Sequence, residues 1–512
     1  MARLTPWLLR FAPLLLLPLA VGAFAQHGPD PQPRDAAVVN RVTWGATPTE
    51  LARARDMGID RYLHAQLHPS TPDTLPAEVQ QRIDALSISR QSDEDARAIQ
   101  VNMRQQAKAL PQADKQKANR EARQLALQRG REVNERALWR AVYAGNQLQD
   151  QMTWFWMNHF NVDFQKGDVG IFLSQYEDRA IRPHALGKFR DLLLATMRSP
   201  SMLIYLDNSR NVAGKINENY ARELMELHTL GVDGGYSQND VQELARILTG
   251  LGIGNSLEPP KVRPALRGQV VQRGYFLFHP ARHDYGNKVF LGHAIAGTGM
   301  QEVEQAADLL ARQPATATFI SSKLATYFVG DAPPASLIHK MSRTFRDKDG
   351  DITATLQTLF ASPEFAASLK AGVFKDPVHY VYSSLRLTYD GMPPIINSKA
   401  GVGLLKRLGQ PLNQRVTPDG YPLSQSDWSG SGQMTTRFEI AGVIAGAPQA
   451  FYRESAGERP PTLPQPRNLL QADDANGLFS SLSPRTRKAI EQAKSTALAN
   501  TYLLASPEFM RR

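Results

Sequence analysis

The stretch 79–144 is rich in glutamine, alanine, arginine, glutamate and leucine and has few glycines. These residue types favour helices, so the stretch predicts long helices, with a break near Pro111 because proline interrupts a helix interior. Alternating apolar and polar residues, which are typical of strands, are scarce, and 269–278 is the best candidate for a short β-hairpin. We therefore predict a mainly α fold: one large multi-helix domain with a short β-hairpin and a loop-rich C-terminal region.

The length would allow several domains, yet no convincing linker interrupts the chain between Leu138 and Tyr389. A Gly-Tyr-Pro turn at 420–422 and a Ser-Gly run at 429–432 indicate loops in the later part. The predicted segments are a signal peptide at 1–25, a Pro-rich leader at 26–39 and a single large helical domain at 40–512, which includes a charged helical arm at 79–144 and a loop-rich region at 393–466.

The amino-terminal segment has the pattern of a secretory signal peptide. Arg3 and Arg10 precede or border an apolar stretch at 11–24, which closes with an Ala-x-Ala pattern at 23–25. We expect cleavage after residue 25 and a periplasmic or secreted location. The apolar stretch has roughly 14 residues, fewer than the ~20 of a membrane-spanning helix, so no transmembrane anchor is expected after cleavage. A retained anchor is the alternative.

The absence of cysteine excludes disulfides, thiolate nucleophiles, iron–sulfur clusters and cysteine-bound zinc. The formal charge is +10, and removal of the signal peptide would leave 57 basic against 49 acidic residues, a charge of +8. Such a surface favours anionic partners, such as an envelope polymer, and another exported protein is the second partner class that we expect. No nucleic acid partner is expected. A basic surface that serves only solubility is the simpler explanation.

The run 217–231 combines three carboxylates, an arginine and a histidine within about four helical turns. Asn217 is expected to cap this helix, and Gly231 to lie just beyond its end. Glu223 and Glu226 are three residues apart on one stripe, so their carboxylates are expected to approach each other. Two such carboxylates have the groups needed for general acid and base catalysis, or for binding a divalent cation.

An ordinary structural role explains the same helix. Glu218, Arg222 and Glu226 are spaced four residues apart, which is the spacing of an ion-pair ladder. His228, in the expected last turn, would interact favourably with the helix dipole without any ligand.

The segment 154–163 embeds polar residues among large aromatic ones. His159 must find a partner there, because an unpaired buried polar group costs about 1–3 kcal/mol. A backbone carbonyl is the usual partner of a lone histidine, whereas a carboxylate partner would create a general-base pair or a metal site. Trp156 is a candidate for substrate binding.

Two further stretches carry polar groups that could join this cluster. In 176–187, Arg179 and Arg182 are candidates for holding an anionic substrate group, and His184 for a catalytic role. Asp207, from the next motif, could add to the polar cluster. Alternatively, Arg182 and Asp207 tie helix ends together.

A Ser-Pro-Glu joint occurs in the nearly repeated heptapeptides 359–365 and 503–509, and 197–202 is a looser version. Each predicts a helix end followed by a new helix, with serine as the cap and proline at the first position. The joints are too irregularly spaced to indicate a solenoid.

Motifs of well-known enzymes are missing. The chain has no His-Glu-x-x-His, phosphate-binding glycine loop, dinucleotide glycine fingerprint or Gly-x-Ser-x-Gly elbow. The dipeptide His283-Asp284 is weak evidence for a metal phosphohydrolase. The sequence identifies no cofactor and leaves a metal requirement open.

Several motifs of this chain resemble those of a known family. They lie at 40–47, 155–162, 182–187, 205–208, 217–231 and 313–317. In order and spacing they resemble the bacterial family catalogued as domain of unknown function 1800, over nearly the whole chain after residue 25. The resemblance implies an exported, mainly helical protein and brings no established reaction or cofactor. The chain departs from the family pattern at three positions. Met157 and Gln313 stand where the resemblance leads us to expect histidine, and Leu251 stands where we expect tryptophan.

Two functions are compatible with the sequence. The first is a periplasmic or secreted hydrolase acting on a glycan or another polymer, with Glu223 and Glu226 as acid and base and with His159, His184 and His228 as orienting or metal groups. The second is a non-catalytic accessory protein with an internal ion-pair network, which binds an envelope polymer or protein through arginines of the arm. These arginines are Arg120, Arg123, Arg129 and Arg131.

Overall fold

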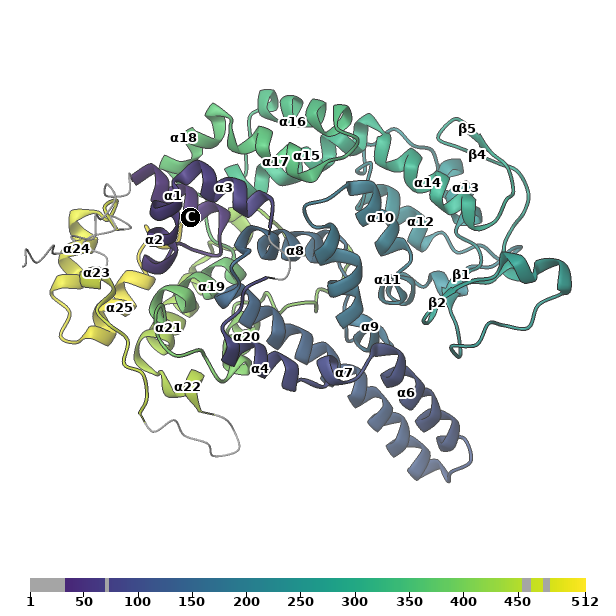
Figure 1. The fold of residues 1–512 in the computed structure, drawn as a ribbon, viewed down its shortest axis with the longest axis horizontal. Helices are drawn as coiled ribbons and strands as arrows, with labels where there is room; N and C mark the ends of the chain where they lie inside the picture. The colour runs from purple at the N-terminus through teal and green to yellow at the C-terminus, as the bar shows by residue number, and fades with distance from the viewer. Residues whose placement is uncertain (1–32, 70–72, 454–461, 473–478) are drawn as a thin grey trace, which may run out of the picture.

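The computed structural model describes residues 33–69, 73–453, 462–472 and 479–512 and confirms the mainly α fold (Figure 1). The predicted signal peptide at 1–25 lies outside the described residues. The leader predicted at 26–39 is described only from Pro33, where the first helix already begins. No helix among the described residues is long and apolar enough to cross a membrane.

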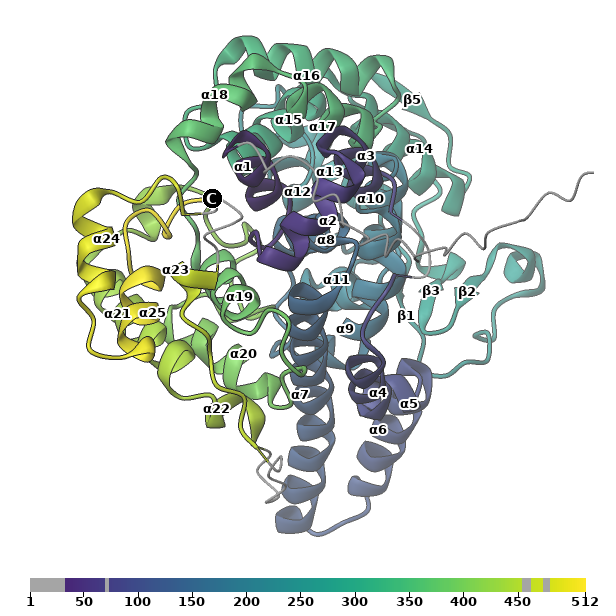
Figure 2. The same cartoon turned by 60° about the vertical axis from the view of Figure 1, so that its left-hand side comes forward.

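Short helices precede the arm, and two long ones form it. The short helices are α1 (Pro33–Val42), α2 (Pro48–Met57), α3 (Ile59–Leu67), α4 (Ala77–Ala85) and α5 (Ser87–Arg90). The arm consists of α6 (Asp93–Ala107) and α7 (Gln112–Tyr143), which pack side by side and project from the body (Figures 1 and 2). Pro111 is the residue before α7, so the helices break where the sequence places the break.

Buried ion pairs fix the base of the arm. The Arg129 guanidinium is fully buried and bonds the Asp93 carboxylate, whose other oxygen accepts from the Gln175 backbone N–H at 2.9 Å. Arg129 therefore stabilises the arm and does not belong to a solvated basic face. The other arginines proposed for partner binding are exposed, as contact with an anionic partner requires; they are Arg120, Arg123 and Arg131. The prediction that Arg129 belongs with them is wrong.

The middle of the chain surrounds α8, which is almost completely buried. The elements of this part are α8 (Gln147–His159), α9 (Val169–Gln175), the π-helix η1 (Tyr176–Ile181), η2 (Arg182–His184), α10 (Phe189–Met197), α11 (Pro200–Tyr205), η3 (Asn208–Arg210), α12 (Asn219–Glu226) and α13 (Gln238–Ile247). Phe155, Trp156 and Phe160 pack in the main hydrophobic core, so α8 is a central support of the fold.

The strands are short and antiparallel. They are β1 (Leu251–Ile253), β2 (Val271–Arg273), β3 (Phe276–Phe278), β4 (Lys288–Phe290) and β5 (His293–Ile295), with η4 (Pro264–Gln269) and η5 (Pro280–Arg282) between them. The hairpin expected at 269–278 is present as β2 and β3, with Val271 opposite Phe278, and β1 pairs with the other edge of β3. The second hairpin, β4 with β5, was not predicted, because three-residue strands are too short to show an alternating pattern.

Helices also dominate the later part. They are α14 (Met300–Arg312), α15 (Pro314–Val329), α16 (Ala335–Asp347), α17 (Ile352–Phe360), α18 (Pro363–Ala371), α19 (Pro377–Thr388), α20 (Ser398–Arg407), η6 (Gln425–Asp427), α21 (Ser431–Gly446), α22 (Gln449–Tyr452), α23 (Leu469–Ala472), α24 (Pro484–Glu491) and α25 (Thr496–Leu504). The region 393–466 is therefore only partly loop, since α20 and α21 lie within it. A second hydrophobic core joins α7 to α19, α20, α21 and α25.

Residues 411–423, here called the cover loop, fold back over the end of α8. The Tyr421 backbone N–H donates to Asn158 Oδ1 at 2.7 Å, and Asn158 Nδ2 donates to the Tyr421 carbonyl at 2.9 Å. Asn161 Nδ2 donates to the Arg415 and Thr417 carbonyls, each at 2.9 Å. The asparagines thus bond backbone groups more than 250 residues away.

Gly420 permits this close approach. Its φ is 74°, and a Cβ at this position would lie 2.1 Å from the Asn158 carbonyl oxygen. We predict that Gly420→Ala lowers the free energy of unfolding by about 2 kcal/mol, because it adds backbone strain and a clash. Gly430→Ala is the matched control, since Gly430 has φ −62° and open space around it. Urea unfolding of the two variants measures the difference, and equal losses would contradict the prediction.

Candidate functional site

The helix expected at 217–231 is shorter than predicted. Asn217 Oδ1 accepts from the Asn219 backbone N–H at 3.1 Å, so Asn217 forms a turn before α12 rather than its cap. The helix ends at Glu226, and the His228 N–H then reaches back to the Glu223 carbonyl at 3.1 Å. Gly231 has φ 82°, the left-handed conformation expected after the helix.

The ion-pair ladder on α12 is present. Arg222 contacts Glu218 at 3.1 Å and Glu226 at 3.3 Å, and its guanidinium is partly exposed. Exposed pairs of this spacing stabilise a helix by only a few tenths of a kcal/mol. The ladder therefore occupies Glu226, one of the two carboxylates proposed for catalysis, without excluding a second role for it.

Glu223 differs from its neighbours because its pKa is raised. Partial burial is the main cause, and the negative charges of Glu226 and Asp419 add to it, whereas Arg222 opposes it. Asp419 lies on the cover loop, and burial would raise its pKa, but hydrogen bonds from Arg415 and Thr417 lower it below the ordinary value. The pKa values of the two carboxyl groups are thus shifted in opposite directions, as those of an acid and a base are.

His159 is buried among aromatic rings and forms no ion pair with a carboxylate of the described residues, and its Nε2 is 3.0 Å from the His228 carbonyl oxygen. A carbonyl only accepts, so Nε2 carries the proton, and the backbone is the partner of this ring. His228 is also fully buried, and neither of its ring nitrogens has a hydrogen-bond partner among the described residues. The rings of Phe160 and Phe319 pack against the pair.

A lysine accompanies the two histidines. Burial, and then the positive charge of Lys323, lower the pKa of His228 to about 3. Burial is also the main cause that holds the pKa of His159 well below its usual range, and the charge of Lys323 comes second. Burial lowers the pKa of Lys323 itself to about 8, against the opposing effect of Asp419. Both imidazoles are therefore neutral at pH 7.

Three of the predicted residues have structural partners elsewhere. Trp156 is fully buried and donates from Nε1 to the Ala185 carbonyl at 2.9 Å. Arg182 binds Asp150 at 2.8 Å, and Asp207 binds Lys166 at 2.8 Å. These contacts join neighbouring elements, as the structural alternative proposed, and they do not bring the three side chains together with Glu223.

Arg179 and His184 line a separate cleft of about 540 Å³, here called the arginine cleft. Its basic and hydroxyl-bearing lining residues are Arg179, His184, Arg190, Arg198, Ser199 and Arg273. Only two carboxylates, those of Glu94 and Asp191, line it as well. Burial lowers the pKa of His184, so this ring is neutral at pH 7. The positively charged groups of the cleft are therefore its arginines alone.

The arginines of the cleft are held to different degrees. Arg190 bonds Asp308 at 2.6 Å, Arg198 bonds Glu304, and the exposed Arg179 contacts Glu94 at 3.5 Å. Arg273, on β2, is exposed and forms no ion pair within the part of the chain that the structure describes. The carboxylates of Asp308, Glu304 and Glu94 thus orient the guanidinium groups that they bind. Arg273 keeps all its donors available.

A π-helix shapes one wall of the arginine cleft. The wider turn of η1 presents Arg179 to the cleft, while the preceding Glu177 and Asp178 bind Arg140 on α7 at 2.6 and 2.9 Å. Single π turns inside α-helices occur frequently at functional sites. The two ion pairs hold this unusual turn against the long helix of the arm.

Ser199 contributes a hydroxyl that has no partner among the described residues, although the residue is only 5% exposed. The sequence predicts that Ser199 caps the helix starting at Pro200, and this prediction is wrong, since its side chain makes no capping bond. At the equivalent joint Ser362 does cap α18. Ser199 is nevertheless one of the residues that line the arginine cleft, with its hydroxyl buried.

The sequence matches the model of a family described as "Protein of unknown function (DUF1800)" over residues 37–511. The chain belongs to this family. The match confirms the resemblance found from the motifs. No curated protein and no solved structure matches the chain.

Within the described residues of this DUF1800 protein, no three His, Asp or Glu side chains are grouped so that they could hold a metal ion. Sequence reasoning missed Lys323, Asp419 and Arg273, because each lies far along the chain from the motif it meets. Ser199 was noticed only as a cap. For Arg273, the one signal available in the sequence was its position in the hairpin predicted at 269–278.

The buried imidazole of His228 predicts acid sensitivity. Its folded pKa of about 3 lies below the ordinary value, so the unfolded chain binds a proton more readily and stability is lost as the pH falls below about 6.5. We predict that His228→Phe reduces this loss by about 1 kcal/mol per pH unit between pH 6 and 4. Urea unfolding at several pH values measures the slope.

Exposed His293 on β5 supplies the control for this measurement. His293→Gln should keep the acid sensitivity of the parent protein. A His228→Phe variant with the parental slope would show that His228 is not the sensitive group.

Proposed function

We propose that this DUF1800 protein is a binding protein for an anionic polymer, which it holds through the arginine cleft. The observation that carries the proposal is the convergence of four arginines on one cleft of about 540 Å³, of which Arg273 forms no ion pair with a described residue. Guanidinium groups bind carboxylate and phosphate with paired hydrogen bonds. A cleft of this volume suits one or two charged units of a chain rather than a whole polymer.

The surroundings of the cleft favour an extended ligand. Glu94, near the start of α6, lines the cleft, so the arm begins at its edge. Arg120, Arg123 and Arg131 are exposed on the long helix of the same arm. Additional arginines along the arm would raise the local concentration of a polyanion by long-range attraction. The predicted signal peptide supports a polymer of the cell envelope as the natural ligand.

Polymer binding is tested with Arg273→Gln, because Arg273 has no structural ion pair to lose. We expect the variant to bind a fluorescent polyphosphate roughly fivefold more weakly than the parent in fluorescence anisotropy, with an unchanged melting temperature. Arg343→Gln, at an exposed position of α16, is the control of equal charge change. Binding should weaken with salt, and neutral dextran should not bind. Equal affinities for the two variants, or affinity that is independent of salt, would contradict the proposal.

Hydrolysis of a glycan or another polymer is the second candidate function, and the opposed pKa shifts of Glu223 and Asp419 favour it. Glu223, with the raised pKa, would donate a proton to the leaving group. Asp419, with the lowered pKa, would activate water. This assignment replaces Glu226 by Asp419 as the base, because Glu226 is held in the ladder with Arg222.

The catalytic proposal predicts that Glu223→Gln lowers the release of reducing ends from envelope polysaccharide by about 100-fold or more, the usual effect of removing a general acid. Glu218→Gln, at the residue before the same helix, removes a ladder carboxylate and should retain the activity. A folded Glu223→Gln variant with parental turnover would exclude this role. Circular dichroism verifies the fold of both variants.

A further inference from the structure

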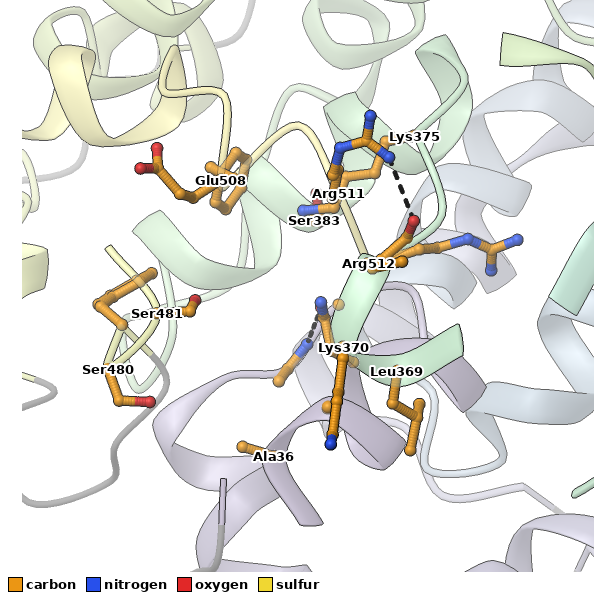
Figure 3. A pocket seen from close by; sticks show the side chains of 18 of the residues that line it. Ala36, Leu369, Lys370, Lys375, Ser383, Ser480, Ser481, Glu508, Arg511 and Arg512 are labelled. Carbon is orange, nitrogen blue, oxygen red and sulfur yellow. Dashed lines mark hydrogen bonds between the residues drawn. The ribbon is translucent and has the colours of Figure 1, made fainter. Parts of the chain in front are cut away.

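A cavity of about 630 Å³ lies where α1, α18 and the C-terminal segment 479–512 meet (Figure 3). Its lining is mostly apolar, and the principal apolar residues are Ala36, Ala366, Leu369, Phe479, Leu482 and Phe509. The volume is within the range of small-molecule binding sites. None of the residues proposed above for polymer binding or hydrolysis lines this cavity, so it is independent of both functions.

Lys375 is the unusual group in this cavity. The residue is only 3% exposed, and its side chain lines the cavity. Its Nζ lies 3.7 Å from the centroid of the Phe509 ring, and it forms no hydrogen bond or ion pair with any described residue. A cation over an aromatic face is stabilised, but much less than one paired with an anion.

The nearby carboxylates are committed to other partners. Asp376, the next residue, accepts from the His379 backbone N–H at 2.8 Å and contacts the His379 ring at 3.0 Å. Glu508 accepts from the Ser483 backbone N–H at 3.0 Å. Neither forms an ion pair with Lys375, so the structure leaves the amine without a counterion.

Two positive charges act on the amine. Burial, and then the guanidinium groups of Arg437 and Arg512, hold the pKa of Lys375 well below its usual range. At the cavity wall Arg511 is engaged with the Gly372 carbonyl at 3.2 Å (Figure 3). An anion next to Lys375 would favour the charged amine and restore its pKa, so binding would be coupled to proton uptake.

We propose that this cavity binds a monocarboxylate with an apolar tail, whose carboxylate pairs with the Lys375 amine while the tail contacts the apolar lining. The size of the cavity, its apolar lining and the buried Lys375 amine without a counterion agree on this ligand class. Lys370 also lines the cavity, but its side chain is exposed.

The proposal is tested by calorimetric titration of the full chain with decanoate and with decanol. The parent protein should bind decanoate at least tenfold more tightly, because decanol has the same tail and no charge. The heat of decanoate binding should differ between phosphate and Tris buffers as a proton is taken up. Failure of decanoate to bind the folded parent, or equal binding of the two ligands, would overturn the proposal.

A variant pair places the binding at Lys375. Lys375→Met keeps most of the side-chain volume and removes the amine, and we expect it to lose at least tenfold in decanoate affinity while decanol binding stays the same. Lys406→Met, at an exposed position of α20, is the control of equal charge change. Undiminished decanoate binding by a folded Lys375→Met variant would overturn the proposal. The parent comparison of decanoate with decanol decides the case if this variant does not fold.

Discussion

The fully buried guanidinium of Arg41 holds distant parts of the chain in one arrangement. It donates to the Phe328 carbonyl on α15, to the Ser368 hydroxyl and carbonyl on α18, and to the Arg512 carbonyl at 2.8 and 3.1 Å. Burial of a charged group is unfavourable unless its donors are satisfied, so this interaction requires all three partners to stay in place. The wall that α1 and α18 give to the apolar cavity depends on the same contact.

The protein repeats this solution in its second core. Arg386 donates to the carbonyls of Gly45, Ala141 and Val142, and the guanidinium of Arg437 stacks on the rings of Phe374 and Tyr380 at 4.8 Å each. Arg386 also contacts the Glu50 carboxylate at 3.5 Å. Carbonyl dipoles and aromatic faces thus supply most of the partners of these two interior cations.

Local signals predicted the helices better than their ends. Composition alone indicated the arm and its break at Pro111, and the ladder through Arg222 follows from helical spacing. The cap at Asn217 failed because its side chain turns the backbone one step before the helix, an alternative that asparagine always offers. Helix α21 was missed because its first residues are serine and glycine, and its apolar residues appear only later.

The candidate sites were harder to predict than the fold. Helical periodicity fixes which residues of one segment share a face, but the charge of Asp419 acts on Glu223 and that of Lys323 on His159 between segments far apart in the chain. Sequence placed His159, His184 and Glu223 in one hypothetical cluster. In the structure, His184 lines a cleft with arginines, whereas His159 is enclosed by aromatic rings.

The cover loop has a consequence for the order of folding. Asn158 and Asn161, at the end of the central helix α8, bond backbone groups that enter the chain about 250 to 260 residues later. Contacts at such separation form slowly, because a long loop must close before they contribute. During synthesis the end of α8 therefore stays uncovered until residue 421 has emerged. An intermediate in which the aromatic residues of α8 are exposed would be a target for chaperones.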